Sequence, residues 1–424
     1  MVQQQITSKM KRGTIEAFVL HAVGMGLLLL MQIYLGRTLG KAGYGVFSYA
    51  LALAGVLAIL VPLGWPTALM RFIARYTEEG RLGLLRGAVN TAYAVTFLST
   101  MVVSLVLLAF SFWDAISEEL HVSLRYAALL LLFLAFVGLR RKALQGLGRV
   151  RGSLIPEEVL LPVIVILGVY TFGVSTASGA LLVYAGAALA AFVLGGFWLW
   201  RAMPGGARIA KPEYERRAWM SIALPMMFGG MSQIAMNRAD VLILGALASV
   251  EAVGLYGAAA RIAAVNVFVL GAVNQLAAPM MARAFHGGRP AQVGAILRRA
   301  MLWSALGSLP LFLIMFLFPR TLLGLFGPGF TEGADVLRVL AVGQFINAAT
   351  GPVGFALLMT GRERAFAATT AAVAVATVTG SLLAIPAFGV VGAALVTAAS
   401  VATLNLSQLA LVLKRGFTPR VGEG

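Results

Sequence analysis

The sequence contains no cysteine and only three histidines, His21, His121 and His286, which lie far apart along the chain. Disulfides, thiolate metal sites and cysteine nucleophiles are therefore excluded, and no pair of histidines has the spacing of a zinc-binding helix. We expect no metal and no other cofactor. No set of residues is spaced for catalysis, so we also expect a protein that is not an enzyme and has no catalytic residues.

Charged residues are scarce as well, since they make up 12% of the chain, whereas soluble domains carry about 25%. Hydrophobic residues make up 60%, and the mean hydropathy is +0.90. A water-soluble domain cannot bury this much apolar surface, so the solvent around the protein must be lipid. The 48 glycines agree with this, because small residues let membrane helices approach one another closely.

Apolar runs of about 20 residues, the length needed to span a bilayer, recur along the whole chain. We place them at 14–36, 44–68, 88–112, 122–139, 155–174, 177–200, 219–247, 253–281, 300–318, 337–360, 365–386 and 391–413. The predicted fold class is therefore an all-α polytopic membrane protein with about twelve transmembrane helices.

The positive charge follows the same pattern. A net charge of +17 could indicate nucleic acid, but the charges lie in short segments between apolar runs, so we expect no nucleic-acid partner. Lys and Arg accumulate before the first run and in every second loop, because these residues resist translocation. The other loops hold only Arg37, Lys41, Arg125, Arg320 and Arg338. We therefore expect a multi-pass protein of the inner (plasma) membrane with both termini in the cytoplasm.

The two halves of the chain are similar to each other. LGRTLGKAGYGVFSYALALAG (35–55) and LGALASVEAVGLYGAAARIAA (244–264) share a Leu-Gly, a short link and a Tyr-Gly that opens an alanine-rich helix. The matching pairs are Tyr44-Gly45 and Tyr256-Gly257. We predict a six-helix lobe at 1–200, a cationic cytoplasmic linker at 201–217 and a second six-helix lobe at 218–424. Such a parallel duplication predicts a central cavity between the lobes.

Three stretches carry a resemblance to a known family: 35–53, NRADVLILGALASVEAVGLYGAAARIAA (237–264) and FGVVGAALVTAAS (388–400). Together with the helix count, they resemble the polysaccharide (O-antigen) flippases of the multidrug, oligosaccharidyl-lipid and polysaccharide exporter superfamily. The resemblance implies two lobes that rock between inward-open and outward-open states. It also implies a polyprenyl-pyrophosphate-linked oligosaccharide as the substrate.

Ion-coupled multidrug antiporters of the same superfamily are the alternative. They often place a carboxylate deep in the first helix, whereas this chain has only Glu16 there, near the end of the helix. The charge that we predict inside the membrane is net positive, which favours an anionic substrate. A membrane-embedded glycosyltransferase is a more distant alternative, because the longest outer loop, near 319–336, holds only Glu332 and Asp335.

Arg238, Asp240 and Arg261 fall inside predicted helices, where a charge is expensive unless it faces a cavity or a partner. Asp240 and Arg261 lie at equal distances from a turn that we place near Val250-Glu251, so we predict that they meet as a buried pair. This pair is either a structural salt bridge or a titratable, cation-sensing latch. We predict that Arg238 faces the cavity, where its forked donors could bind pyrophosphate.

Other charged residues lie near the ends of predicted helices. Arg37 and Lys41, in the first outer link, are either a cationic exit for pyrophosphate or an ordinary solvated loop. Arg71 and Arg75 follow the second run and either gather the substrate headgroup or anchor the chain to anionic lipid. We interpret Glu157 and Glu158 as interfacial partners of Arg149 and Arg151, and His21 as a hydrogen-bonded packing residue rather than a proton relay.

The leading hypothesis is that the protein flips a lipid-linked oligosaccharide for polysaccharide biosynthesis. A pyrophosphate-linked sugar cannot shed its water in lipid without replacement partners, and a cationic hydrated cavity supplies them. The polyprenyl tail stays in the membrane lipid meanwhile, so no covalent step is needed. We expect the protein to act as a monomer.

Overall fold

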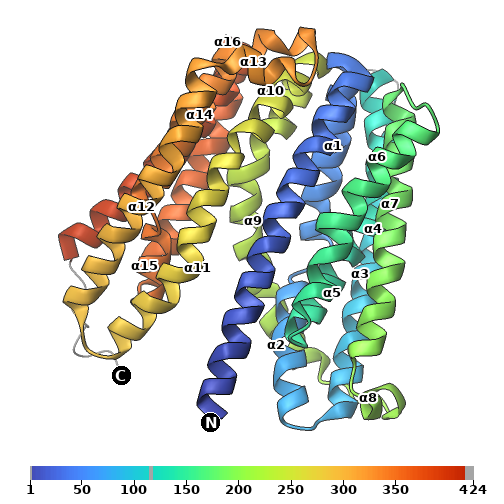
Figure 1. Cartoon of the computed structure of the whole chain (residues 1–424). Coiled ribbons are helices and arrows are strands. Elements are labelled where there is room, and N and C mark those ends of the chain that lie inside the picture. Colours follow the sequence, from blue (N-terminus) through green and yellow to red (C-terminus); the bar gives the residue numbers. More distant parts are fainter. Residues whose placement is uncertain (1, 114–117, 416–424) are drawn as a thin grey trace. The chain divides into compact units, whose positions relative to one another are not determined.

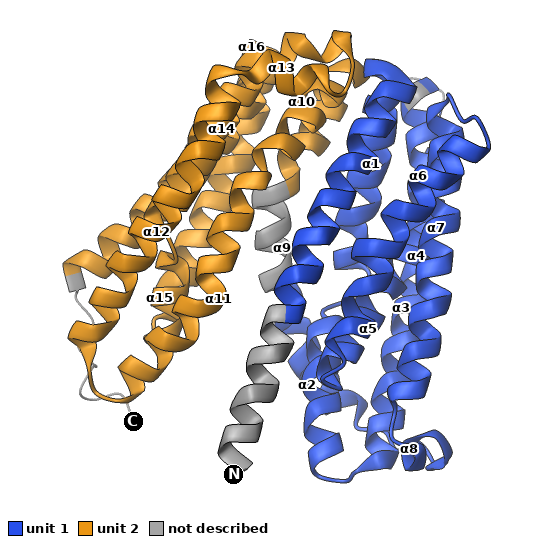
Figure 2. Ribbon diagram, viewed as in Figure 1, with its two compact units in different colours: residues 1–231 blue, residues 232–424 orange. Residues whose placement is uncertain are grey.

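The computed structural model describes residues 2–113 and 118–415, except for the side chains of 2–15, 119, 228–237 and 415. Every regular element in these residues is a helix (Figure 1). The chain divides into two compact units, residues 1–231 and 232–424 (Figure 2). The first unit includes the predicted linker 201–217.

Nine stretches of the described residues are long and apolar enough to cross a membrane. Two of them, Glu16–Leu60 and Glu363–Lys414, each contain a kink at a glycine, Gly40 (φ 66°) and Gly389 (φ 58°). Glycine adopts this positive φ at little steric cost, and each kink falls between two predicted runs. Helix α9 (Arg216–Leu247) matches the predicted run 219–247. The predicted all-α polytopic membrane fold is confirmed.

The first unit is built from a series of helices that ends within α9. They are α1 (Val2–Leu60), α2 (Trp65–Glu78), α3 (Leu82–Phe110), α4 (Glu118–Gly146), α5 (Val150–Leu154), the π-helix η1 (Ile155–Leu160), α6 (Leu161–Thr171), α7 (Ala177–Ala202), α8 (Gly205–Ile209) and the start of α9. Helix α1 runs to one end of this unit, turns at Gly40 and returns (Figure 1). Helices α2 and α8 lie at the end to which it returns.

Helix α2 is amphipathic and closes that end of the first unit. Its buried face carries Trp65, Phe72 and Tyr76 at helical spacing, and Trp219 of α9 packs against them with its ring centroid 6.1 Å from that of Trp65. The Trp219 indole N–H donates to the hydroxyl of Tyr76 at 2.9 Å. Gly64 permits this contact, because a Cβ there would overlap the carbonyl oxygen of Ala223. The beginning of α9 is thus part of the first unit.

The second unit contains the rest of α9 and the helices after it. They are α10 (Val250–Ala263), α11 (Val265–His286), α12 (Pro290–Leu317), α13 (Pro319–Gly324), the 3₁₀-helix η2 (Pro328–Gly333), α14 (Ala334–Thr350), α15 (Val353–Met359) and α16 (Glu363–Arg415). Within this unit α14 packs on α16 and α11 on α12.

Several predicted runs differ from the observed helices at their ends. The run 44–68 stops at Leu60, and a turn with Leu63 and Gly64 at positive φ separates it from α2. The run 337–360 breaks at Gly351 and Pro352, where glycine takes φ 66° and proline has no N–H to donate. The run 155–174 opens with a π-helix. These interruptions are local backbone features inside segments of uniform apolar character.

Candidate functional site

Asp240 is a buried carboxylate of the second unit, with 6% of its surface exposed. The hydroxyl of Tyr256 on α10 donates a short hydrogen bond to its Oδ2. The hydroxyl of Thr397 on α16 donates to the same oxygen at 3.1 Å, and it lies 3.0 Å from the Tyr256 hydroxyl. The other carboxylate oxygen accepts from the backbone N–H of Val241 at 2.7 Å. Asp240 therefore joins three helices by accepting hydrogen bonds from hydroxyl groups.

The position of the turn explains why Tyr256, and not Arg261, reaches Asp240. Ser249 caps α10 by accepting from the N–H of Ala252 at 3.3 Å, so the turn is centred on 248–249 instead of the predicted 250–251. The residue on α10 at the depth of Asp240 is then close to 256. Arg261 is five residues further on, about 140° around the helix. Among the side chains that the structure describes, no ion pair joins Arg261 to Asp240.

Arg238 is half-buried in α9, two residues before Asp240. Two residues correspond to about 200° of helical rotation, so the two side chains point to opposite sides of α9. That Arg238 faces a cavity stays a prediction. Its role as a ligand for pyrophosphate stays a prediction.

The structure does not bring the other predicted substrate residues into one site. Arg37 lies near the turn at Gly40. Arg71 and Arg75 lie on α2, which comes after the 20 residues of α1 that follow this turn. A helix of 20 residues is about 30 Å long, so Arg37 is about that far from the two α2 arginines. Both α2 arginines are exposed, and the Nε of Arg75 donates to Glu79 at 2.7 Å. That hydrogen bond lowers the pKa of Glu79 below its ordinary value. The Arg75 guanidinium is therefore already engaged by a carboxylate.

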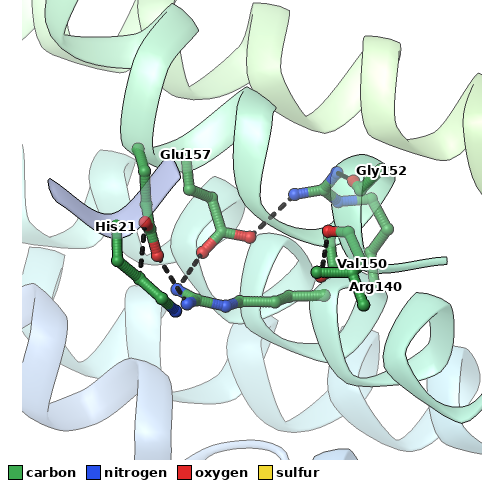
Figure 3. A network of polar contacts seen from close by, with 8 residues as sticks. His21, Arg140, Val150, Gly152 and Glu157 are labelled. Carbon is green, nitrogen blue, oxygen red and sulfur yellow. Dashed lines mark hydrogen bonds and ion pairs between the residues drawn. The ribbon is translucent and has the colours of Figure 1, made fainter. Parts of the chain in front are cut away.

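A network of four charges lies inside the first unit (Figure 3). Arg140 of α4 has a fully buried side chain, and its Nη2 lies 2.8 Å from a carboxylate oxygen of Glu157 on η1. Arg141 contacts Glu157 at 3.1 Å and Glu158 at 2.7 Å. The two arginines balance the two glutamates, which offsets part of the cost of burying charge.

His21 extends this network to α1. Its Nδ1 lies 2.7 Å from Glu158, and 39% of its side chain is exposed. Gly24, one turn later on α1, lets the helix approach, because a Cβ there would lie 2.6 Å from the Cβ of Glu158. Five residues before His21, Glu16 contacts Arg151 at 2.7 Å. These contacts tie α1 to the π-helix and to α5.

Our interpretation of Glu157 and Glu158 as partners of Arg149 and Arg151 differs from the contacts observed. A π-helix holds an extra residue per turn, so side chains around it are rotated by up to about 100° relative to a regular helix. Glu157 and Glu158 therefore face α4. The adjacent Arg140-Arg141, directly after the apolar run 122–139, was the signal in the sequence that could have found this network.

The chemistry available in these clusters is the binding of polar and charged groups. The described residues contain no group of three or more His, Asp or Glu side chains that could hold a metal ion. Both clusters instead connect separate helices through charged and hydroxyl groups, which suits a protein that binds a polar solute while its helices move.

Comparison with known proteins identifies the family. The model of the family described as "Polysaccharide biosynthesis protein" matches residues 10–285, and the model described as "MatE" matches residues 225–386. A curated relative from Haloferax volcanii, "Probable low-salt glycan biosynthesis flippase Agl15", is 24% identical over 393 residues, which cover 92% of this chain and 81% of the relative.

Solved structures share the fold. The inward-facing conformation of a MATE family multidrug transporter of the MOP superfamily has a TM-score of 0.75 at 15% identity, covering 93% of this chain and 98% of that one. The lipid II flippase MurJ in an inward closed conformation has a TM-score of 0.69 at 12% identity, covering 95% of this chain and 87% of that one. The fold is that of membrane transporters, and the chain belongs to the polysaccharide biosynthesis protein family.

Proposed function

We propose that the protein is a flippase that moves a polyprenyl-pyrophosphate-linked oligosaccharide across the inner membrane for polysaccharide biosynthesis. Membership of the polysaccharide biosynthesis protein family supports the biosynthetic role, and the relative named as a glycan biosynthesis flippase supports the transport step. In alternating access, the two compact units would be the two moving bodies. The protein would work as a monomer. The reaction makes and breaks no covalent bond.

The observation that carries the choice of substrate is the half-buried Arg238 on α9. A cation inside a membrane-spanning helix is expensive unless it contacts water, a partner or an anionic ligand. A guanidinium presents two parallel donors, which match two oxygens of a phosphate group better than the single point charge of an ammonium does. On this match of donors to oxygens we assign Arg238 to the pyrophosphate.

Asp240 is assigned to energy coupling. A carboxylate held by the hydroxyls of Tyr256 and Thr397 lies at the junction of three helices, so a coupling cation that bound to it would alter how these helices pack. The predicted pair of Asp240 with Arg261 belongs in this proposal to another conformation of the transport cycle. Forming it requires α10 to rotate by about 140° and to shift by about 7.5 Å along its axis, so that Arg261 replaces Tyr256.

The experiment is polysaccharide export in cells that lack the native flippase and express Arg238 variants. Arg238→Ala should abolish export at nearly normal membrane abundance, and Arg238→Lys should restore part of it. Arg320→Ala, which removes an exposed arginine of the same unit, is the matched control and should export normally. Normal export by Arg238→Ala would show that Arg238 does not bind the pyrophosphate.

An ion-coupled multidrug antiporter is the second candidate, favoured by the TM-score of 0.75 to a MATE transporter and by the MatE match at residues 225–386. In that case the cells would gain resistance to organic cations, and Arg238→Ala would leave the resistance intact or raise it. The same variants therefore separate the two candidates.

A further inference from the structure

The end of α7 and the segment after it form a surface of the first unit that the proposed transport does not use. Helix α7 exposes large apolar side chains at Leu189 (42%), Val193 (59%), Phe197 (50%) and Trp200 (57%). Their spacing places them on one face of the helix. A continuous face of large apolar side chains on a membrane-spanning helix suits lipid acyl chains, and Trp200 at its end marks the depth of the headgroups.

Arg208 fixes the short helix α8 at this depth. Its guanidinium carbon lies 4.4 Å from the centroid of the Trp200 ring, a cation–π contact. Its Nη2 donates to the carbonyl oxygens of Arg201 at 2.8 Å and Met203 at 3.2 Å, which belong to the end of α7. Ile209, the next residue, is 85% exposed. An isoleucine this exposed beside a tryptophan at headgroup depth is placed to enter the interface.

Hydrogen bonds to and from the backbone of the rest of the segment hold it on α3. Arg86 donates to the carbonyl oxygen of Ala210 at 2.8 Å, and the N–H of Glu213 donates to the carbonyl oxygen of Gly83 at 3.0 Å. Gly87 makes room for the segment, because a Cβ there would overlap the carbonyl oxygen of Glu213. The segment 201–217 is therefore a fixed part of the first unit and presents its side chains in defined positions.

The charge of the segment is positive. Its exposed cations are Arg201, Lys211, Arg216 and Arg217. Of the two acidic residues, Glu215 contacts Arg81 at 3.3 Å. The segment thus combines exposed apolar groups at headgroup depth with a surplus of exposed cations, and the surface that complements both is a bilayer containing anionic phospholipid.

We propose that residues 200–217 form a docking surface for anionic phospholipid headgroups, with Ile209 inserted between the lipids and the cations on their phosphates. The segment then anchors the first unit to the bilayer surface, independently of the transported substrate. Each cation near an anionic membrane surface strengthens binding by about fivefold at low salt. High salt should weaken this contribution, because it screens exposed charges.

The depth of Ile209 can be measured directly, because the chain contains no cysteine and Ile209→Cys introduces a single thiol. The full chain, labelled there with a fluorophore and reconstituted in nanodiscs, should be quenched by phospholipid carrying a nitroxide near the headgroup. Quenching should rise when phosphatidylglycerol replaces phosphatidylcholine. A label that stays in water in both bilayers would overturn the proposal.

The charge is tested with a matched pair of double variants. Arg216→Gln with Arg217→Gln removes two exposed adjacent arginines, and Arg298→Gln with Arg299→Gln removes a similar exposed pair from α12 in the second unit. The first should lower retention of phosphatidylglycerol during detergent washing by an order of magnitude or more, and the second should change it much less. Equal losses would mean that lipid retention reflects net charge alone. Neither readout requires transport, so failure here is separate from failure of the proposed function.

Discussion

The hydroxyl of Tyr44 donates a hydrogen bond to the side-chain oxygen of Gln32 across 2.8 Å, and both residues are buried. The matching tyrosine of the second half, Tyr256, donates in the same way to Asp240. In each case a tyrosine that follows the turn reaches back to a polar residue on the helical segment before the turn. The two halves therefore share this contact but differ in charge, since the acceptor is a neutral amide in the first unit and a carboxylate in the second.

This difference predicts unequal effects of removing the two hydroxyls. Tyr256→Phe withdraws a donor from a buried carboxylate and should destabilise the protein by about 1–3 kcal/mol, whereas Tyr44→Phe withdraws one from a neutral acceptor and should cost about 0.5–1.5 kcal/mol. Thermal unfolding of both variants in the same detergent measures this. A larger loss of stability for Tyr44→Phe than for Tyr256→Phe would contradict the view that the acceptor of Tyr256 is charged and that of Tyr44 is neutral.

Two adjacent glycines of α7 provide a test of the charge network. A Cβ at Gly195 would overlap the guanidinium of Arg140, whereas a Cβ at Gly196 meets no atom within 4 Å. Gly195→Ala should displace Arg140 from Glu157 and destabilise the protein by at least the 1–3 kcal/mol of an overpacked core. Gly196→Ala should change stability by less than about 1 kcal/mol. Equal unfolding temperatures for the two variants would show that Arg140 is not packed against α7.

The spanning segments could be predicted because runs of about 20 apolar residues are visible in the sequence itself. The turns at Gly40 in α1 and at Gly389 in α16 also fall in the gaps between predicted apolar runs. The partner of Asp240 on α10 depends on the position of the turn, which the Ser249 cap moves by two residues from the predicted one. A shift of this size changes the partner from an arginine to a tyrosine.

The charge network of the first unit could not be predicted in the same way. The π-helix Ile155–Leu160 rotates Glu157 and Glu158 toward α4, and nothing in the apolar periodicity reveals an extra residue in one turn. The contact of Gly195 with Arg140 is equally hidden, because it joins residues far apart in the sequence. Which side chains meet between two helices depends on the direction of each side chain. One extra residue in a turn rotates that direction by about 100° and changes the partner.

The bond between Arg75 and Glu79 predicts how α2 responds to pH and to mutation. The lowered pKa of Glu79 means that the contact contributes stability above the ordinary carboxyl pKa and loses it as the pH falls through the lowered value. Near neutral pH Arg75 therefore stays engaged. If Arg75 collects the substrate headgroup, Glu79→Gln should lower the substrate concentration needed for half-maximal flipping, and Arg75→Gln should raise it. Identical concentration dependence in both variants would remove Arg75 from the substrate path.

The proposed orientation can be tested with reporter fusions. Fusions after Gly80, Gly148, Gly206, Gly288 and Arg362 should report the cytoplasm, and fusions near Lys41, Glu118 and Gly329 should report the outside, because Lys and Arg accumulate in the former segments. The most informative site is Gly206 in the segment between the two predicted lobes. A periplasmic signal there would contradict the arrangement of six helices before the linker and six after it.

The central claim is tested most directly by flipping in proteoliposomes. The purified protein is reconstituted with a polyprenyl-pyrophosphate-linked oligosaccharide, and the fraction of glycan accessible to an added glycosidase is followed in time. We predict that the wild-type protein makes the inner-leaflet glycan accessible, that Arg238→Ala does not, and that Arg320→Ala behaves as wild type. Glycan that stays inaccessible with wild-type protein, while an organic cation crosses the same membranes, would contradict the proposal and favour a multidrug antiporter.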